Sequence, residues 1–345
     1  MIFTYVTCFV MSMMTVYFLT KFLVWLTNKG KLTFLVFNKR DARKSSVLMG
    51  GVVLLISIFA NTLLLTSTVS TEFKVGLFGA VVMVIFAMLG ESYRWNGGAK
   101  LVAQVVVVSV VILGGVSIDY LTFPFISKVV LFSPVESFIV TLVWMLVIIN
   151  MFNLIDGLDG LASGVSAIAA VMLFFISLTV SPVFVLFLLL SMAGSTLAFL
   201  RFNFYPAAIS LGNSGAFLLG YLFAFCSVLG IMKSTLSFTI LFFVFALPFM
   251  DIGLSIIRRL IKKQSIFSAD LLHIHHQLVR RGVSERRAVL TLYVMSGCFG
   301  SVAFLMSLEY SRPIQTICAA VILVLVFGYF GVLQTSVGKS MKQRT

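Results

Sequence analysis

The sequence predicts an all-α protein that crosses a membrane about eleven times. Hydrophobic residues make up 60% of the 345 residues, and the mean hydropathy is +1.13. Charged residues make up only 10%, whereas a soluble domain carries about 25%. Apolar runs of about twenty residues, the length of a membrane-spanning helix, recur along the whole chain.

Each expected span is an apolar run bounded by polar or charged residues, and no polar stretch is long enough to mark a domain boundary. We therefore expect one integral-membrane domain over residues 1–345. In chain order, the expected spans are 2–27, 47–69, 73–90, 101–118, 135–153, 161–180, 182–200, 210–232, 234–257, 288–308 and 313–335.

The basic residues fall mainly on one side of this arrangement. Most of the 25 lysines and arginines lie in the C-terminal tail and in the connections 28–46, 91–100, 201–209 and 258–287. Loops rich in lysine and arginine stay in the cytoplasm, so the N-terminus is expected outside and the C-terminus inside. The location is then the inner (plasma) membrane. The net charge of +14 reflects this topology, and no nucleic-acid partner is expected.

Segment 150–164 carries the most unusual chemistry. Asn150, Asn153 and Asp156 are three residues apart, so on a helix they project from nearly the same face. Asp159 extends the row past a glycine that allows the helix to break. Carboxylates this close to a hydrocarbon core are costly unless they are paired, hydrated or metal-bound. The alternative is a solvated loop with capping residues, but the repeated Asp-Gly after two amides favours a functional site.

The connection 258–287 contains all three histidines, His273, His275 and His276, among several arginines that include Arg280. A metal cluster is one interpretation. However, alternate residues of a helix face apart, and no nearby Cys or Glu completes a zinc site. Imidazoles among cations suit an anionic ligand better, because arginine and histidine donate hydrogen bonds to phosphate oxygens. The alternative is an exposed basic loop that contacts anionic lipid.

These two segments resemble the polyprenyl-phosphate N-acetylhexosamine-1-phosphate transferases of glycosyltransferase family 4. Segment 150–164 is similar to the family motif N-x-x-N-x-x-D-G-x-D-G-L-A, and 272–278 is similar to H-I-H-H-x-L. The second motif is typical of the undecaprenyl-phosphate GlcNAc-1-phosphate transferase branch, which starts O-antigen and teichoic acid synthesis. Pro248 with Asp251, and segment 267–270, also match. The resemblance covers almost the whole chain.

The resemblance implies a reaction between a UDP-N-acetylhexosamine and polyprenyl phosphate that releases UMP and starts a cell-surface glycan such as the O-antigen of lipopolysaccharide. It implies a cytoplasmic-facing active cleft with catalytic carboxylates at Glu91, Asp156 and Asp159. The expected cofactor is Mg²⁺, or Mn²⁺ in its place, with Asp156, Asp159 and Asn213 as its ligands. A homodimer is also compatible with the resemblance.

The same resemblance implies the substrate contacts. Lys44 and Lys100 suit the phosphate of the lipid, and Lys100 with Gln104 resembles a K-x-x-x-Q pattern of the family. The amides orient the carboxylates, and the histidine segment holds the nucleotide diphosphate. The complete set of expected substrate-binding residues is Asn150, Asn153, His273, His275, His276, Arg280, Lys44 and Lys100.

Three motifs depart from the family pattern. Glu91 and Ser92 stand where the family has an Asp-Asp pair, and Asn213 replaces the aspartate of G-D-x-G. Segment 43–46 has Ser46 where a histidine is expected. Two functions therefore stay open: an active transferase that tolerates these changes, or a catalytically impaired relative that binds polyprenyl phosphate or UDP-sugar, or acts as a partner in glycan assembly. A proton-coupled transporter is less favoured, because no span has a carboxylate at its middle.

Overall fold

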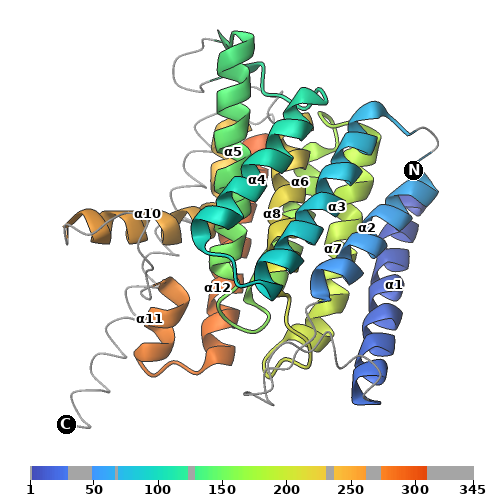
Figure 1. The fold of residues 1–345 in the computed structure, drawn as a ribbon, viewed down its shortest axis with the longest axis vertical. Helices are drawn as coiled ribbons and strands as arrows, with labels where there is room; N and C mark the ends of the chain where they lie inside the picture. The colour runs from blue at the N-terminus through green and yellow to red at the C-terminus, as the bar shows by residue number, and fades with distance from the viewer. Residues whose placement is uncertain are drawn as a thin grey trace. The chain divides into compact units, whose positions relative to one another are not determined.

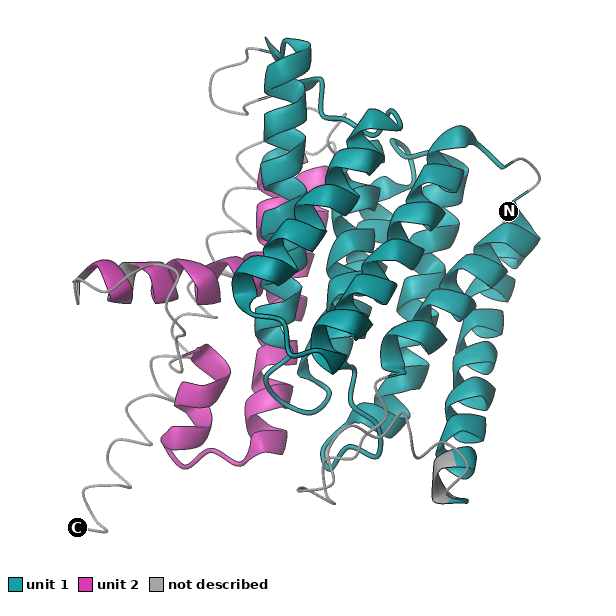
Figure 2. Ribbon diagram, viewed as in Figure 1, with its two compact units in different colours: residues 1–238 teal, residues 239–345 magenta. Residues whose placement is uncertain are grey.

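A computed structural model of the chain describes residues 2–29, 49–66, 69–122, 129–230, 237–261 and 273–308. The chain divides into two compact units, unit 1 with residues 1–238 and unit 2 with residues 239–345 (Figure 2). The single domain expected over the whole chain stays a prediction. Among the described residues, secondary structure consists of helices and one two-stranded sheet.

The described helices follow the apolar runs of the sequence closely. They are α1 (Ile2–Asn28), α2 (Gly50–Leu65), α3 (Thr71–Ser92), α4 (Gly97–Leu113), α5 (Pro134–Ile155), α6 (Leu161–Ser177), α7 (Val183–Asn203), α8 (Gly212–Leu229), α9 (Ser237–Val244), α10 (Ala246–Ile261), α11 (Ile274–Arg280) and α12 (Glu285–Ser307).

Six of these helices, α1, α3, α5, α7, α8 and α12, are long and apolar enough to cross a membrane. The bent pair formed by α9 and α10 is either a broken seventh span or a re-entrant loop. Helices α2, α4 and α6 are apolar but shorter. The chain is therefore a mostly helical, multi-pass membrane protein. Every expected span up to residue 308 overlaps one of these helices or the bent pair. The expected span 313–335 lies outside the described residues.

One expected span is not a single helix. The sequence predicts a span over 234–257, but α9 and α10 meet at an angle of 85°. Pro248 lies in the first turn of α10 and has no N–H to donate to the carbonyl of Val244, so the α9 hydrogen-bond ladder cannot continue past this point. The prediction of one continuous helix was therefore wrong, because proline is tolerated where a helix begins but not within it.

Helix α8 lies at the centre of unit 1, where it packs against α3 and α5 (Figure 1). Glycines make this packing close. The Cβ of an alanine at Gly220 would lie 2.7 Å from the Cα of Ile149 on α5. On α3, Gly79 faces the ring of Tyr221, whose hydroxyl donates to the carbonyl of Gly76 at 3.0 Å. Small residues are typical of such helix interfaces in membranes, because they let the backbones approach.

Three connections lie at one end of unit 1 (Figure 1): 93–96 between α3 and α4, 156–160 between α5 and α6, and 204–211 between α7 and α8. The antiparallel strands β1 (Tyr120–Thr122) and β2 (Val129–Leu131) join α4 to α5 at the opposite end, with Tyr120 paired to Leu131. The first end carries most of the residues that the sequence singled out.

Candidate active site

The last turns of α5 carry the amides of the predicted row. The side-chain nitrogen of Asn150 donates to the Gln104 side-chain oxygen on α4 at 2.7 Å and to the carbonyl of Leu146 at 2.8 Å. The Gln104 nitrogen donates back to Asn150 at 3.4 Å. Asn153 lies one turn further along and is half-buried. Gln104 is 1% exposed, so this amide pair is an internal link between α4 and α5.

The α5 helix ends where the sequence predicts a break, and Asp156 is its C-terminal capping residue. The next turn leads to Gly160, which adopts a left-handed conformation with φ of 81° directly before α6. Residues other than glycine rarely adopt this conformation. Within the turn, Asp159 accepts a hydrogen bond from the backbone N–H of Ala207 at 3.0 Å. Asp159 therefore joins the connection after α5 to the connection before α8.

Carboxylates from two helices converge at this end of unit 1. The pKa of Asp156 is raised to about 7, first by the surrounding protein, which disfavours the charged form, and then by the nearby carboxylates of Glu91 and Asp159. Glu91, at the end of α3, interacts with the amine of Lys100 and accepts a hydrogen bond from the backbone N–H of Asn213. The structure thus places the three carboxylates expected to be catalytic within electrostatic reach of one another, and the backbone of Asn213 beside Glu91.

This donor set fits a divalent cation that also takes ligands from a substrate. Like charges that gather in a partly buried place favour a cation between them. One carboxylate oxygen of Glu91, Oε2, is buried without a hydrogen-bond partner among the described residues. Within the same residues, no three His, Cys, Asp or Glu side chains form a group that could hold a metal ion by themselves. Mg²⁺ suits such a site, because it commonly binds one or two carboxylates together with phosphate oxygens and water.

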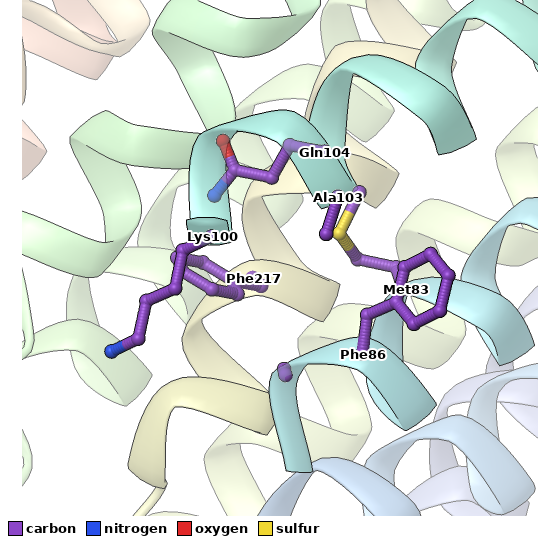
Figure 3. A pocket seen from close by; sticks show the side chains of 7 residues that line it. Met83, Phe86, Lys100, Ala103, Gln104 and Phe217 are labelled. Carbon is purple, nitrogen blue, oxygen red and sulfur yellow. The ribbon is translucent and has the colours of Figure 1, made fainter. Parts of the chain in front are cut away.

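A shallow pocket with room for little more than a water molecule adjoins Lys100 between α3, α4 and α8 (Figure 3). Its lining is mostly apolar, and the amine of Lys100 extends away from the ring of Phe86 (Figure 3). The lining residues are Met83, Phe86, Ala87, Lys100, Ala103, Gln104 and Phe217.

The histidine segment belongs to unit 2. His273 directly precedes the short helix α11, which carries His275, His276 and Arg280. His273 is 7% exposed and His275 is 2% exposed. The interpretation of this segment as an exposed loop was therefore wrong for His273 and His275, whereas Arg280 is exposed. Apolar side chains beside the histidines, Ile274 and Leu278, are buried with them, and they anchor the segment in the unit.

The three imidazole rings lie close together, although alternate residues of one helix would face apart. The rings of His273 and His275 are stacked with centroids 5.7 Å apart, and those of His275 and His276 are 4.2 Å apart. His273 precedes the helix rather than lying in it, which explains the difference. Burial, followed by the field of His276, lowers the pKa of His275 to about 4. Burial also lowers the pKa of His276, with His273 and Arg280 as further causes.

Comparison with known proteins identifies the family. The profile described as Glycosyl transferase family 4 matches residues 73–231. Over 303 residues the chain is 31% identical to a probable undecaprenyl-phosphate N-acetylglucosaminyl 1-phosphate transferase of Bacillus subtilis, and the match covers 87% of this chain and 84% of the relative. The chain belongs to glycosyl transferase family 4.

Other members of family 4 match shorter parts of the chain. A decaprenyl-phosphate N-acetylglucosaminephosphotransferase of Mycobacterium leprae is 34% identical over 127 residues, which is 32% of each chain. An undecaprenyl-phosphate alpha-N-acetylglucosaminyl 1-phosphate transferase of Thermotoga maritima is 33% identical over 139 residues, which is 40% of this chain and 45% of the relative.

Within this family 4 fold, the expected site residues are distributed over both units. Unit 1 holds the carboxylates, the amides, Lys100 and Asn213, whereas unit 2 holds the histidine segment with Arg280. Lys44 lies outside the described residues. The proposed site did not include Ala207 or Asp251. The backbone N–H of Ala207 leaves no signal in the sequence. Asp251 did have a signal, because Pro248 and Asp251 match the family pattern.

Proposed function

We propose that this protein transfers N-acetylhexosamine-1-phosphate from a UDP-sugar to polyprenyl phosphate, which starts a cell-surface glycan. The observation that carries the proposal is the convergence of Glu91, Asp156 and Asp159 beside Lys100 at one end of a membrane-embedded helical unit. Phosphoryl transfer depends mainly on positioning and on neutralisation of charge, and this set of side chains supplies both.

In the proposed reaction, an oxygen of the lipid phosphate attacks the β-phosphorus of the UDP-sugar. The bond from that phosphorus to the oxygen bridging it to the α-phosphorus breaks, and UMP leaves. A bound Mg²⁺, or Mn²⁺, would neutralise charge on the diphosphate. Asp156, Asp159 and the side-chain oxygen of Asn213 would hold it, and Asn153 would orient the carboxylates. The expected role of Asn150 is different here, because its side-chain nitrogen donates to Gln104 and to the carbonyl of Leu146.

The remaining residues bind the two substrates. Lys100 attracts the lipid phosphate. Lys44 is proposed as a second contact to the same phosphate. The histidine segment and Arg280 hold the nucleotide diphosphate through hydrogen bonds to its oxygens. A homodimer is compatible with this scheme.

We also propose about eleven spans, an outside N-terminus, and cytoplasmic loops at 28–46, 91–100, 154–160, 201–209 and 258–287. The bias of lysine and arginine supports this orientation. A membrane-impermeant thiol reagent applied to intact cells should not label single cysteines placed in these loops. Labelling within 258–287 from outside would reverse the orientation.

The direct test of the reaction is UMP release by the purified protein from UDP-N-acetylglucosamine, with polyprenyl phosphate and Mg²⁺. Release should need all three components, and Asp156→Asn should abolish it. The reaction is repeated with other UDP-N-acetylhexosamines to find the preferred sugar. Absence of release with every sugar, together with absence of UDP-sugar binding, would contradict the proposal.

A catalytically impaired relative is the second candidate. Asn213 brings an oxygen but no charge to the place where the family has an aspartate, and the Glu91 carboxylate already interacts with Lys100 and with the Asn213 backbone. Such a protein would bind polyprenyl phosphate or UDP-sugar, or act as a partner in glycan assembly. Calorimetric binding of UDP-N-acetylglucosamine without detectable UMP release would favour this candidate.

A further inference from the structure

A buried carboxylate of unit 2 has no role in the reaction as proposed so far. Asp251, on α10, is 3% exposed. One of its oxygens, Oδ2, lies 2.8 Å from Nδ1 of His273. The other, Oδ1, accepts a hydrogen bond from the backbone N–H of Ile274 at 2.7 Å. Ile274 is the first residue of α11, so Asp251 holds both the first histidine and the start of the helix that carries the other two.

The first contact determines the protonation of the His273 ring. A carboxylate only accepts hydrogen bonds, so Nδ1 of His273 carries a proton and donates it. The second nitrogen, Nε2, has no hydrogen-bond partner among the residues that the structure describes. Nε2 is therefore the ring nitrogen available to a ligand. An anion bound there needs the doubly protonated ring, in which Nδ1–H donates to Asp251 and Nε2–H donates to the anion.

The second contact fixes the beginning of α11. The first N–H groups of a helix have no partner within the helix, and a side chain that accepts from one of them stabilises the helix start. Here the accepting side chain is Asp251 of α10. The N-terminal capping residue, His273, makes no side-chain hydrogen bond to the helix start. Loss of the Asp251 oxygen would therefore release the segment as well as the ring.

We propose that Asp251 is a positioning residue for nucleotide binding. It presents Nε2 of His273 to a phosphate oxygen of the nucleotide diphosphate, and it holds α11 so that His275 and His276 stay in place beside that ring. The inference rests on the proposed function, because it assigns the anion to the UDP-sugar. Asp251 itself does not touch the substrate.

The test uses Asp251→Asn, because an amide keeps the oxygen that accepts from Ile274. Its nitrogen, however, can only donate to Nδ1, so Nδ1 cannot carry a proton. The ring then stays neutral, with its one proton on Nε2, and loses the charge-assisted hydrogen bond to the phosphate. Calorimetric titration of the full-length protein with UDP-N-acetylglucosamine should show about tenfold weaker binding in this variant. The exposed Leu254 lies on the same helix, and Leu254→Ala should leave the affinity unchanged.

A double-mutant cycle separates positioning from a general structural role. If Asp251 acts through His273, then Asp251→Asn should cause little further loss of affinity when His273→Ala is already present. A purely structural effect would weaken binding equally in both backgrounds, and that result would overturn the proposal. Unchanged affinity of Asp251→Asn would overturn it as well.

A second measurement does not depend on the ligand. The protein has three histidines, so ¹⁵N spectra of labelled imidazoles can be assigned by single substitution. Without ligand, Nδ1 of His273 should be protonated in the unmodified protein and unprotonated in Asp251→Asn. If the unmodified protein fails to bind UDP-N-acetylglucosamine, the proposed function is contradicted, and the spectra alone then test the pairing. Identical His273 spectra in the two proteins would overturn the pairing itself.

Discussion

Gln104 on α4 and Asn150 on α5 are joined by two side-chain hydrogen bonds, 2.7 and 3.4 Å long, next to the converging carboxylates. Each amide is both donor and acceptor to the other, so the two helices are held in one register at the end of unit 1 that carries the site. Neither residue is charged, and the link does not depend on pH.

Replacement of Gln104 by alanine should lower the free energy of unfolding by about 1–3 kcal/mol, because the partly buried amide of Asn150 loses a partner. Thermal unfolding in detergent measures the effect. A Gln104→Leu, Asn150→Leu double variant, in which neither amide is left unpaired, should be more stable than Gln104→Ala. If Gln104→Ala unfolds at the same temperature as the unmodified protein, the link has no stabilising role.

Two substitutions of Asp159 should separate its structural role from its proposed role in metal binding. Asn keeps an oxygen that can accept from the N–H of Ala207, whereas Ala does not. We expect Asp159→Asn to keep the hydrogen-exchange protection of the Ala207 amide and to lose Mg²⁺-dependent UMP release. Asp159→Ala should lose both. Full release with Asp159→Asn would remove this residue from the metal site.

Gly51 should be essential, because it lets α2 pack closely against the segment that carries Asn213. A Cβ at Gly51 would lie 2.5 Å from the backbone carbonyl carbon of Ser214, and backbone atoms cannot move aside as a side chain can. Gly51→Ala should therefore destabilise the protein by about 1–3 kcal/mol. Gly97→Ala is the matched control, because a Cβ there meets nothing within 4 Å. Equal melting temperatures for the two variants would disprove the close contact.

Restoration of the family residues should raise activity. Ser92 cannot act as a base at neutral pH, and Asn213 contributes no charge to a cation. A Glu91→Asp, Ser92→Asp, Asn213→Asp triple variant should increase the rate of Mg²⁺-dependent UMP release by on the order of 10²–10⁴, the contribution of a general base. Each single variant serves as a control. A native protein that works at a typical enzyme rate and slows on these changes would show that its site uses different residues.

The stability of unit 2 should depend on pH through His275. Its pKa of about 4 in the folded protein lies below its ordinary value of 6.5, so between these values the unfolded chain binds more protons. Stability should therefore be greatest above pH 6.5, fall as the pH drops toward 4, and level off below it. Hydrogen exchange of α11 amides across this range measures the effect. His275→Gln cannot titrate and should flatten this part of the profile, and an equal slope in both proteins would contradict the assignment.

Much of the fold and part of the site could be predicted from the sequence. The apolar runs located the described spans, because a helix in lipid must be apolar over its whole length. The spacing of Asn150, Asn153 and Asp156 placed them along one helix, and the following glycines predicted where that helix ends. These features depend only on neighbouring residues, so the sequence alone determined them.

The tertiary structure decided the pairings between distant segments. Asp159 meets the N–H of Ala207, and Asp251 holds His273 and the start of α11. It also decided that His273 and His275 are buried and that α9 and α10 meet at 85°. Periodicity shows which face of a helix is apolar, but not which remote backbone or side chain that face will meet. That choice depends on how helices pack, and packing is a property of the folded chain rather than of any local stretch.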